Sequence, residues 1–100
     1  MDGDTVQRLR MLAHSLWGRA THDSEAAMGD SFDVRLADSL DLATNGEPGV
    51  AFENLAQNVY EFDVPLTESE YRAFAEVGWS LRLNPNAWAF LRDLVTQVDR

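Results

Sequence analysis

The chain of 100 residues contains no cysteine, no lysine and only three prolines. Without cysteine it can form neither disulfides nor thiolate metal sites, which is compatible with the cytosol. No apolar run approaches the ~20 residues that a membrane helix requires, and the first residues are acidic where a secretory signal would be basic. We therefore expect a cytoplasmic protein that has no membrane partner.

Motifs of known catalytic and ligand-binding sites are also absent. We find no glycine-rich phosphate loop, no nucleophile elbow and no basic stripe, and residues 38–46 lack the alternating oxygen ligands of a calcium loop. Glu53 and Glu61 share a helical face, but two turns separate them on a convex surface, whereas acid–base catalysis requires a cleft. We expect no enzyme, no metal and no cofactor. Only a ligand bound in a concave pocket would revive an enzymatic interpretation.

Acidic residues are abundant and unevenly distributed. The net charge is −9, and residues 23–76 alone carry −11, because thirteen acidic residues face only two basic ones, Arg35 and Arg72. The two flanks, 1–22 and 77–100, each carry +1. Such a field repels nucleic acid and anionic membranes, whereas it attracts a basic partner and speeds the encounter with it.

Helical periodicity dominates the remaining pattern. An apolar fraction of 45% argues for a folded protein despite the charge. One hundred residues is the size of one domain, covering 1–100, which removes roughly two-thirds of its unfolded surface from water. No segment alternates in the manner of a strand. The sequence therefore predicts an all-α fold, a small bundle of about five helices with short connections.

Capping and termination signals place the first two helices. Thr5 is positioned to cap a first helix that runs to about Ala20. Residues 21–30 are small and polar without periodicity, so we interpret them as a connecting loop. A second helix begins near Phe32 and ends at Asn45–Gly46, since glycine tolerates the positive φ that commonly follows a helix.

Stronger signals mark the later helices. The third runs from near Pro48 to near Asp63, with a buried stripe at three-and-four spacing formed by Phe52, Leu55, Val59 and Phe62. Thr67 with Glu70 forms the capping box of the fourth helix. Gly78 is costly in the middle of that helix and predicts a close helix crossing. Asn84–Pro85 begins a fifth helix, which extends to Val98 with Trp88 and Phe90 flanking its apolar seam.

The face of the third helix opposite the apolar stripe is polar and acidic. Glu53, Gln57 and Glu61 run along it, Tyr60 lies at its border, and Asn54 and Asn58 complete it. Glu47, Asp63 and Glu68 extend the negative charge at the two ends. Such a face is often only solvated surface. A tyrosine among carboxylates is nevertheless typical of an anchor for an arginine- or lysine-rich partner.

The central part of the chain resembles a protein family. Its residues Gly46-Glu47, Ala51-Phe52-Glu53-Asn54-Leu55, Tyr60-Glu61-Phe62-Asp63 and Leu66-Thr67 leading to Glu70-Tyr71 are similar to those of small acidic immunity proteins of bacterial polymorphic-toxin and contact-dependent growth inhibition systems, in particular the MafI-like group. The similarity spans about residues 36–83. It implies an all-helical cytoplasmic bacterial protein that binds a cognate toxin domain, often a nuclease, and blocks its active site or substrate groove.

Charge and resemblance together predict an immunity protein that neutralises a basic toxin domain, does not bind nucleic acid directly, and is a monomer or weak dimer when free. Surface chemistry and the matched motif predict the partner-binding residues Glu47, Glu53, Gln57, Tyr60, Glu61 and Asp63. The alternative is a generic helical adaptor or homodimer without a toxin partner, which would use exposed Trp79 and Trp88.

Overall fold

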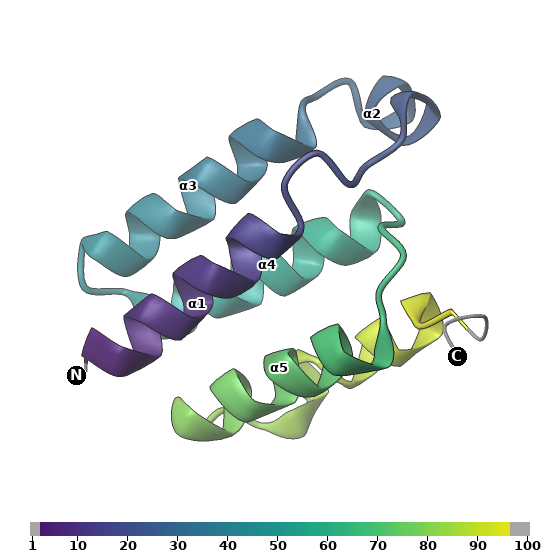
Figure 1. Cartoon of the computed structure of the whole chain (residues 1–100). Helices are drawn as coiled ribbons and strands as arrows, with labels where there is room; N and C mark the ends of the chain where they lie inside the picture. The colour runs from purple at the N-terminus through teal and green to yellow at the C-terminus, as the bar shows by residue number, and fades with distance from the viewer. Residues whose placement is uncertain (1–2, 97–100) are drawn as a thin grey trace.

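The computed structural model describes residues 3–96 and confirms the all-α class (Figure 1). Within this range the chain forms five α-helices and two short 3-10 helices. The elements are α1 (Gly3–Ser15), α2 (His22–Met28), α3 (Phe32–Thr44), α4 (Pro48–Glu61), α5 (Glu68–Ser80), η1 (Pro85–Ala87) and η2 (Ala89–Leu94).

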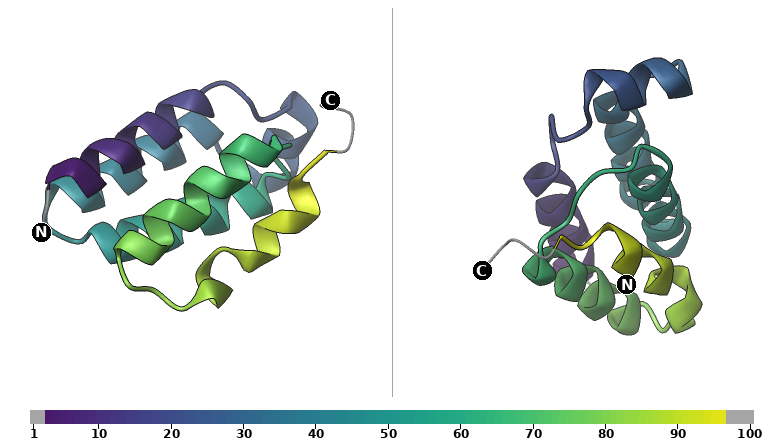
Figure 2. Two further views of the ribbon diagram at one scale, coloured as in Figure 1. Left: turned by 60° about the horizontal axis from the view of Figure 1, so that its bottom comes forward. Right: turned by 90° about the vertical axis from the view of Figure 1, so that its right-hand side faces the viewer.

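Helix α4 lies at the centre of the arrangement and contacts α1, α3, α5 and η2. It runs antiparallel to α3, to which a short turn joins it, while α1 and α5 lie side by side in front of it (Figure 1). Figure 2 shows η1 and η2 returning along α5. One face of α4 is therefore enclosed by the bundle.

The enclosed face carries the predicted apolar stripe. Phe52, Leu55, Val59 and Phe62 are completely buried in one continuous hydrophobic cluster. The Phe62 ring lies 5.3 Å from that of Phe32 on α3, centroid to centroid. Tilted and edge-on aromatic pairs at such distances add to the stabilisation from buried apolar area. The three-and-four spacing thus identified the helix surface on which the core is built.

Local signals also place several helix ends correctly. Thr67 accepts a hydrogen bond from the Glu70 N–H, and the Glu70 carboxylate accepts one from the Thr67 N–H, so the predicted capping box is formed. Ser31 caps α3, and Pro48 stands in the first turn of α4. Gly46, with φ of 88°, lies in the left-handed region in the turn between α3 and α4.

Three predictions for the amino-terminal third are wrong: the Thr5 cap, the end of the first helix near Ala20 and the loop over residues 21–30. Thr5 is not a cap, because α1 begins at Gly3 and Thr5 is buried within it. The helix ends at Ser15, and the chain turns at Gly18, which has φ of 72°. Residues 22–28 form α2 rather than a loop. Thr21 caps it through the Ser24 N–H, and Gly29 ends it in the left-handed conformation.

The predicted fifth helix is also different in the structure. Instead of one α-helix the chain forms η1 and η2, with Trp88 at their junction. The Trp88 side chain does not flank a seam but is only 3% exposed, and it packs against Gly78. The close neighbour of Gly78 is therefore an indole ring, not a helix backbone. Val98 lies outside the described residues.

Candidate protein-binding surface

The outward side of α4 carries most of the predicted binding residues. All six predicted positions, Glu47, Glu53, Gln57, Tyr60, Glu61 and Asp63, are exposed. On a helix with 100° per residue, Glu53, Gln57, Tyr60 and Glu61 share one side. Val50, half exposed, lies among them and was not among the predicted residues. We call Val50, Glu53, Gln57, Tyr60 and Glu61 the α4 face.

The remaining two predicted residues lie at opposite ends of the helix. Glu47 precedes its first turn without capping it through the side chain, and Asp63 follows its last turn with φ of 55°. Fourteen residues separate the helix ends by about 20 Å. A partner that contacts both residues has to cover the whole length of α4.

Two internal contacts order side chains of the α4 face. The Gln57 amide donates a hydrogen bond to the Glu61 carboxylate at 3.0 Å. Tyr60 is 41% exposed as a residue, and its ring packs nearly perpendicular to the ring of Phe90 on η2, with centroids 5.2 Å apart. The phenol is thus supported by a neighbouring element while much of its surface is accessible.

Asn58 does not complete this face as predicted, because it is buried and binds α3, whereas Asn54 is exposed but is also hydrogen-bonded to α3. Asn58 is buried, accepts a hydrogen bond from Arg35 and donates one to the Asn54 carbonyl oxygen. Ser39 donates to the same Asn54 oxygen at 2.6 Å. Since a buried polar group is costly unless it is hydrogen-bonded, the contacts of buried Ser39 and Asn58 specify how α3 and α4 pack. They are structural, and the α4 face ends at them.

Arginines neutralise α5 almost completely. Arg19 binds Glu70 at 2.7 Å, and Arg8 approaches Glu76 at 3.3 Å. Arg92 and Arg72 both pair with Glu68, at 2.7 and 3.9 Å. Glu68 therefore does not extend the negative charge of α4, contrary to the sequence-based expectation.

The α2–α4 part of the molecule is much less compensated. Within residues 3–96, Arg35 is the one arginine that forms an ion pair there, with Asp30 at 2.6 Å. The hydrogen bond from Arg35 lowers the pKa of the Asp30 carboxyl, and the hydrogen bond to Asp30 raises the pKa of Arg35, with smaller contributions from Glu61 and Asp38. Among the described residues, the exposed acids of α3, α4 and their ends that form no ion pair are Asp38, Asp41, Glu47, Glu53, Glu61 and Asp63.

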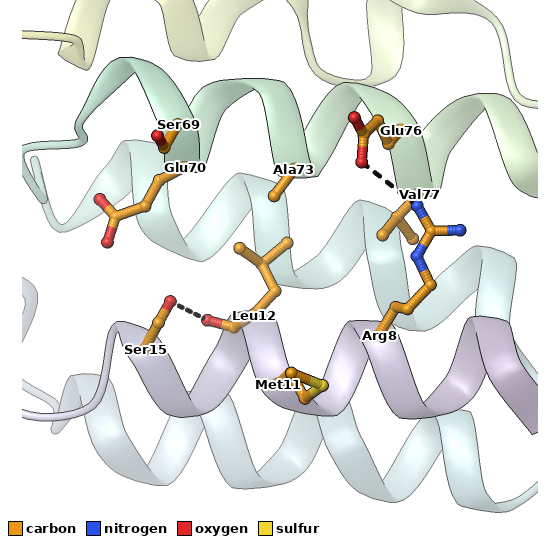
Figure 3. A pocket seen from close by; sticks show the side chains of 9 residues that line it. All are labelled: Arg8, Met11, Leu12, Ser15, Ser69, Glu70, Ala73, Glu76 and Val77. Atoms are coloured by element: carbon orange, nitrogen blue, oxygen red, sulfur yellow. Dashed lines mark hydrogen bonds and ion pairs between the residues drawn. The ribbon is translucent and has the colours of Figure 1, made fainter.

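A groove of about 290 Å³ lies between α1 and α5, with α4 passing behind it (Figure 3). Leu12, Ala73 and Val77 contribute apolar surface, and the Arg8–Glu76 pair stands at one end. The Glu70 carboxylate, at the other end, is already bound by Arg19. In residues 3–96, no three histidine or carboxylate side chains are grouped so that they could hold a metal ion.

The negative charge of Glu70, which lines the groove, is compensated by Arg19. Burial raises the pKa of Glu70, but the hydrogen bonds from Arg19 and from the Thr67 backbone outweigh this effect, so its pKa lies below the ordinary value. A carboxylate held ionised by an arginine is poorly suited to act as a general acid near neutral pH. The Arg19–Glu70 ion pair joins α5 to the segment that follows α1.

The pair of exposed tryptophans required for the adaptor or homodimer alternative is not present. Trp79 is 61% exposed, but its edge-on neighbour Trp88 is buried against it at a centroid distance of 5.3 Å. The prediction that Trp88 is available to a partner is wrong. Trp79 alone remains as an exposed aromatic side chain at that end of α5.

Comparison of the chain with models of known protein families, with curated proteins and with solved structures gives no match. Within the described range, none of the helices combines the length and apolar character needed to cross a bilayer.

Proposed function

We propose that the chain is an immunity protein that binds a basic toxin domain and neutralises it through the α4 face. The proposal is supported by the composition of that face, where an exposed tyrosine and an exposed valine stand among carboxylates. Aromatic and apolar anchors ringed by charged groups are typical of protein-binding surfaces. The resemblance of residues 36–83 to small acidic immunity proteins supplies the class of partner.

The observation that carries the proposal is the uneven pairing of the arginines. Arg8, Arg19, Arg72 and Arg92 neutralise acids of α5, so the negative charge of the molecule is concentrated over α2, α3 and α4. A one-sided field of this kind orients an approaching basic protein and raises its association rate. Folding therefore places most of the uncompensated acidic residues on the part of the surface formed by α2, α3 and α4.

A toxin nuclease suits such a surface because its substrate is a polyanion. Nucleases bind phosphates with positively charged grooves, and a row of carboxylates on a rigid helix presents negative charge to the same groove. In the proposed complex, Tyr60 and Val50 enter the contact centre and Glu53 and Glu61 face basic side chains. Inhibition then results from covering the substrate groove or a surface beside it.

The proposal can be tested with the basic carboxy-terminal domain of a secreted protein encoded in the adjacent upstream reading frame. Titration calorimetry compares the wild type with Glu53→Lys/Glu61→Lys. The control is Asp4→Lys/Glu76→Lys, which changes the charge equally on α1 and α5. Circular dichroism first verifies that both variants are folded. We expect the α4 variant to bind at least tenfold more weakly than the control, about 1.4 kcal/mol, and to lose protection of cells that express the toxin domain.

Equal affinity of the two variants would show that the α4 face is not the contact surface. Absence of a neighbouring secreted protein with a basic carboxy-terminal domain would argue against the immunity class itself. Sedimentation of the free protein tests the alternative. A monomer agrees with the proposal, whereas a tight dimer that is lost in Trp79→Ser favours a homodimer built on the exposed end of α5.

A further inference from the structure

We infer that the α4 face receives an arginine side chain of the partner over the ring of Tyr60. This inference rests on the proposed function and specifies which partner group occupies the centre of the contact. Tyr60 qualifies because its ring is held edge-on by Phe90 and remains 41% exposed. An aromatic ring that is held in place loses little further freedom on binding.

The chain itself contains the kind of contact that we propose. The guanidinium of Arg92, on η2, lies 4.2 Å from the centroid of the Tyr71 ring on α5. Its two terminal nitrogens donate to the Glu68 carboxylate at 2.7 and 3.2 Å. Tyr71 follows Glu68 by three residues, so the ring and the carboxylate lie on neighbouring turns. The Arg92 guanidinium therefore stacks on an aromatic ring and donates two hydrogen bonds to a carboxylate at the same time.

Helix α4 offers a related arrangement, in which the amide of Gln57 stands three residues before the ring where α5 has a carboxylate. Tyr60 follows Gln57 by three residues, and Gln57 is hydrogen-bonded through its amide nitrogen to Glu61, which leaves the Gln57 carbonyl oxygen as an acceptor. In the described part of the chain the structure records no cation over the Tyr60 ring, whereas Tyr71 is occupied. A partner guanidinium stacked on the Tyr60 ring would find the Gln57 carbonyl oxygen as an acceptor one turn away.

Charge and shape favour arginine over other occupants. Glu53 and Glu61 repel anions, and a purely apolar side chain would cover their carboxylates without pairing them. Lysine satisfies the charge and can also lie over a ring, but its ammonium is a compact, strongly hydrated point charge that cannot lie flat on the ring and donate in a fork. A guanidinium stacks on the aromatic face and donates to a carboxylate at the same time.

Blocked hexa-arginine and hexa-lysine peptides test the inference, because they carry the same charge. Their affinities are measured by calorimetry for the wild type, Tyr60→Phe and Tyr60→Leu. We expect the wild type to bind hexa-arginine more tightly than hexa-lysine and Tyr60→Leu to lose roughly two- to fivefold of the affinity for hexa-arginine with little change for hexa-lysine. Tyr60→Phe retains the ring and is expected to retain the preference.

A second measurement covers the case in which Tyr60→Leu does not fold. NMR of the wild type with hexa-arginine is expected to show nuclear Overhauser contacts between arginine δ-protons and the Tyr60 ring. Equal binding of both peptides, no binding of either, or an arginine preference that survives in folded Tyr60→Leu would overturn the inference. The proposed function would then still stand on the charge-reversal experiment, which depends on Glu53 and Glu61 rather than on the ring.

Discussion

Replacement of Gly78 by alanine is expected to destabilise the fold, although the same change inside a helix normally stabilises it by roughly 1 kcal/mol. A Cβ atom added at Gly78 would lie well inside van der Waals contact with Cε3 and Cζ3 of Trp88 and 3.1 Å from Cδ2. These are atoms of a rigid ring, not the end of a flexible side chain. The indole therefore has to move as a unit.

The ring has little room to move. Trp88 is buried, and it packs edge-on against Phe52 at 6.1 Å and Trp79 at 5.3 Å between centroids. Overpacking of a well-packed core costs about 1–3 kcal/mol, and the depth of this overlap places the cost at the upper end. After subtraction of the helix propensity gain, the net loss is about 2 kcal/mol. For a chain of this size it corresponds to a melting temperature lowered by about 8–16 °C.

Urea denaturation followed by tryptophan fluorescence measures this change, and Gly49→Ala provides the matched control. Gly49 also lies in a helix, but its added Cβ would meet only Leu83 Cδ2, at 3.9 Å. We expect Gly49→Ala to be neutral or to stabilise by up to about 1 kcal/mol. In a Trp88→Leu background the penalty of Gly78→Ala is expected to disappear. A stabilising Gly78→Ala in the wild-type background would refute the placement of Trp88 over Gly78.

Two further predictions concern polar contacts between elements. Asn58→Leu removes the buried partner of Arg35 and Asn54 and is expected to cost about 1–3 kcal/mol in urea denaturation, whereas an unchanged midpoint would show that this contact is dispensable. Glu70→Ala is expected to cost about 1 kcal/mol at pH 7. Because the folded pKa of Glu70 is lowered, its contribution is present above about pH 4.3 and is lost as the pH falls through the folded pKa, so the gap between variant and wild type narrows in acid. A gap that is the same at pH 7 and pH 3 would contradict this assignment.

The sequence predicted helices correctly where capping residues close together in the chain were accompanied by an apolar stripe. The α5 capping box joins Thr67 to a residue three positions away, and the α4 stripe depends only on 3.6-residue periodicity. Helix α2 escaped because it has no buried residue and therefore no periodicity, even though Thr21 and Gly29 are ordinary capping residues. Its short capping signal was present but lacked the stripe that usually accompanies one.

The candidate site was predicted in part. Exposure of Glu53, Gln57, Tyr60 and Glu61 followed from the helical wheel of α4, because residues opposite a fully buried stripe face outward. The wheel could not show that α3 covers Asn58 or that η2 brings Phe90 beside Tyr60. Both contacts join elements whose relative placement is not encoded in the periodicity of either one.

By itself the sequence determined that the chain is helical, which side of α4 is buried, and that its middle is acidic, since these depend on residue type and on spacing within a few turns. Only the tertiary structure decided which acidic residues form ion pairs and which stay uncompensated. Arg8 and Glu76 are 68 positions apart, and Arg19 and Glu70 are 51 apart. Only packing of α1 and the turn after it against α5 brings such groups within reach. Among the described residues, Asp38, Asp41, Glu53 and Glu61 stay exposed and form no ion pair.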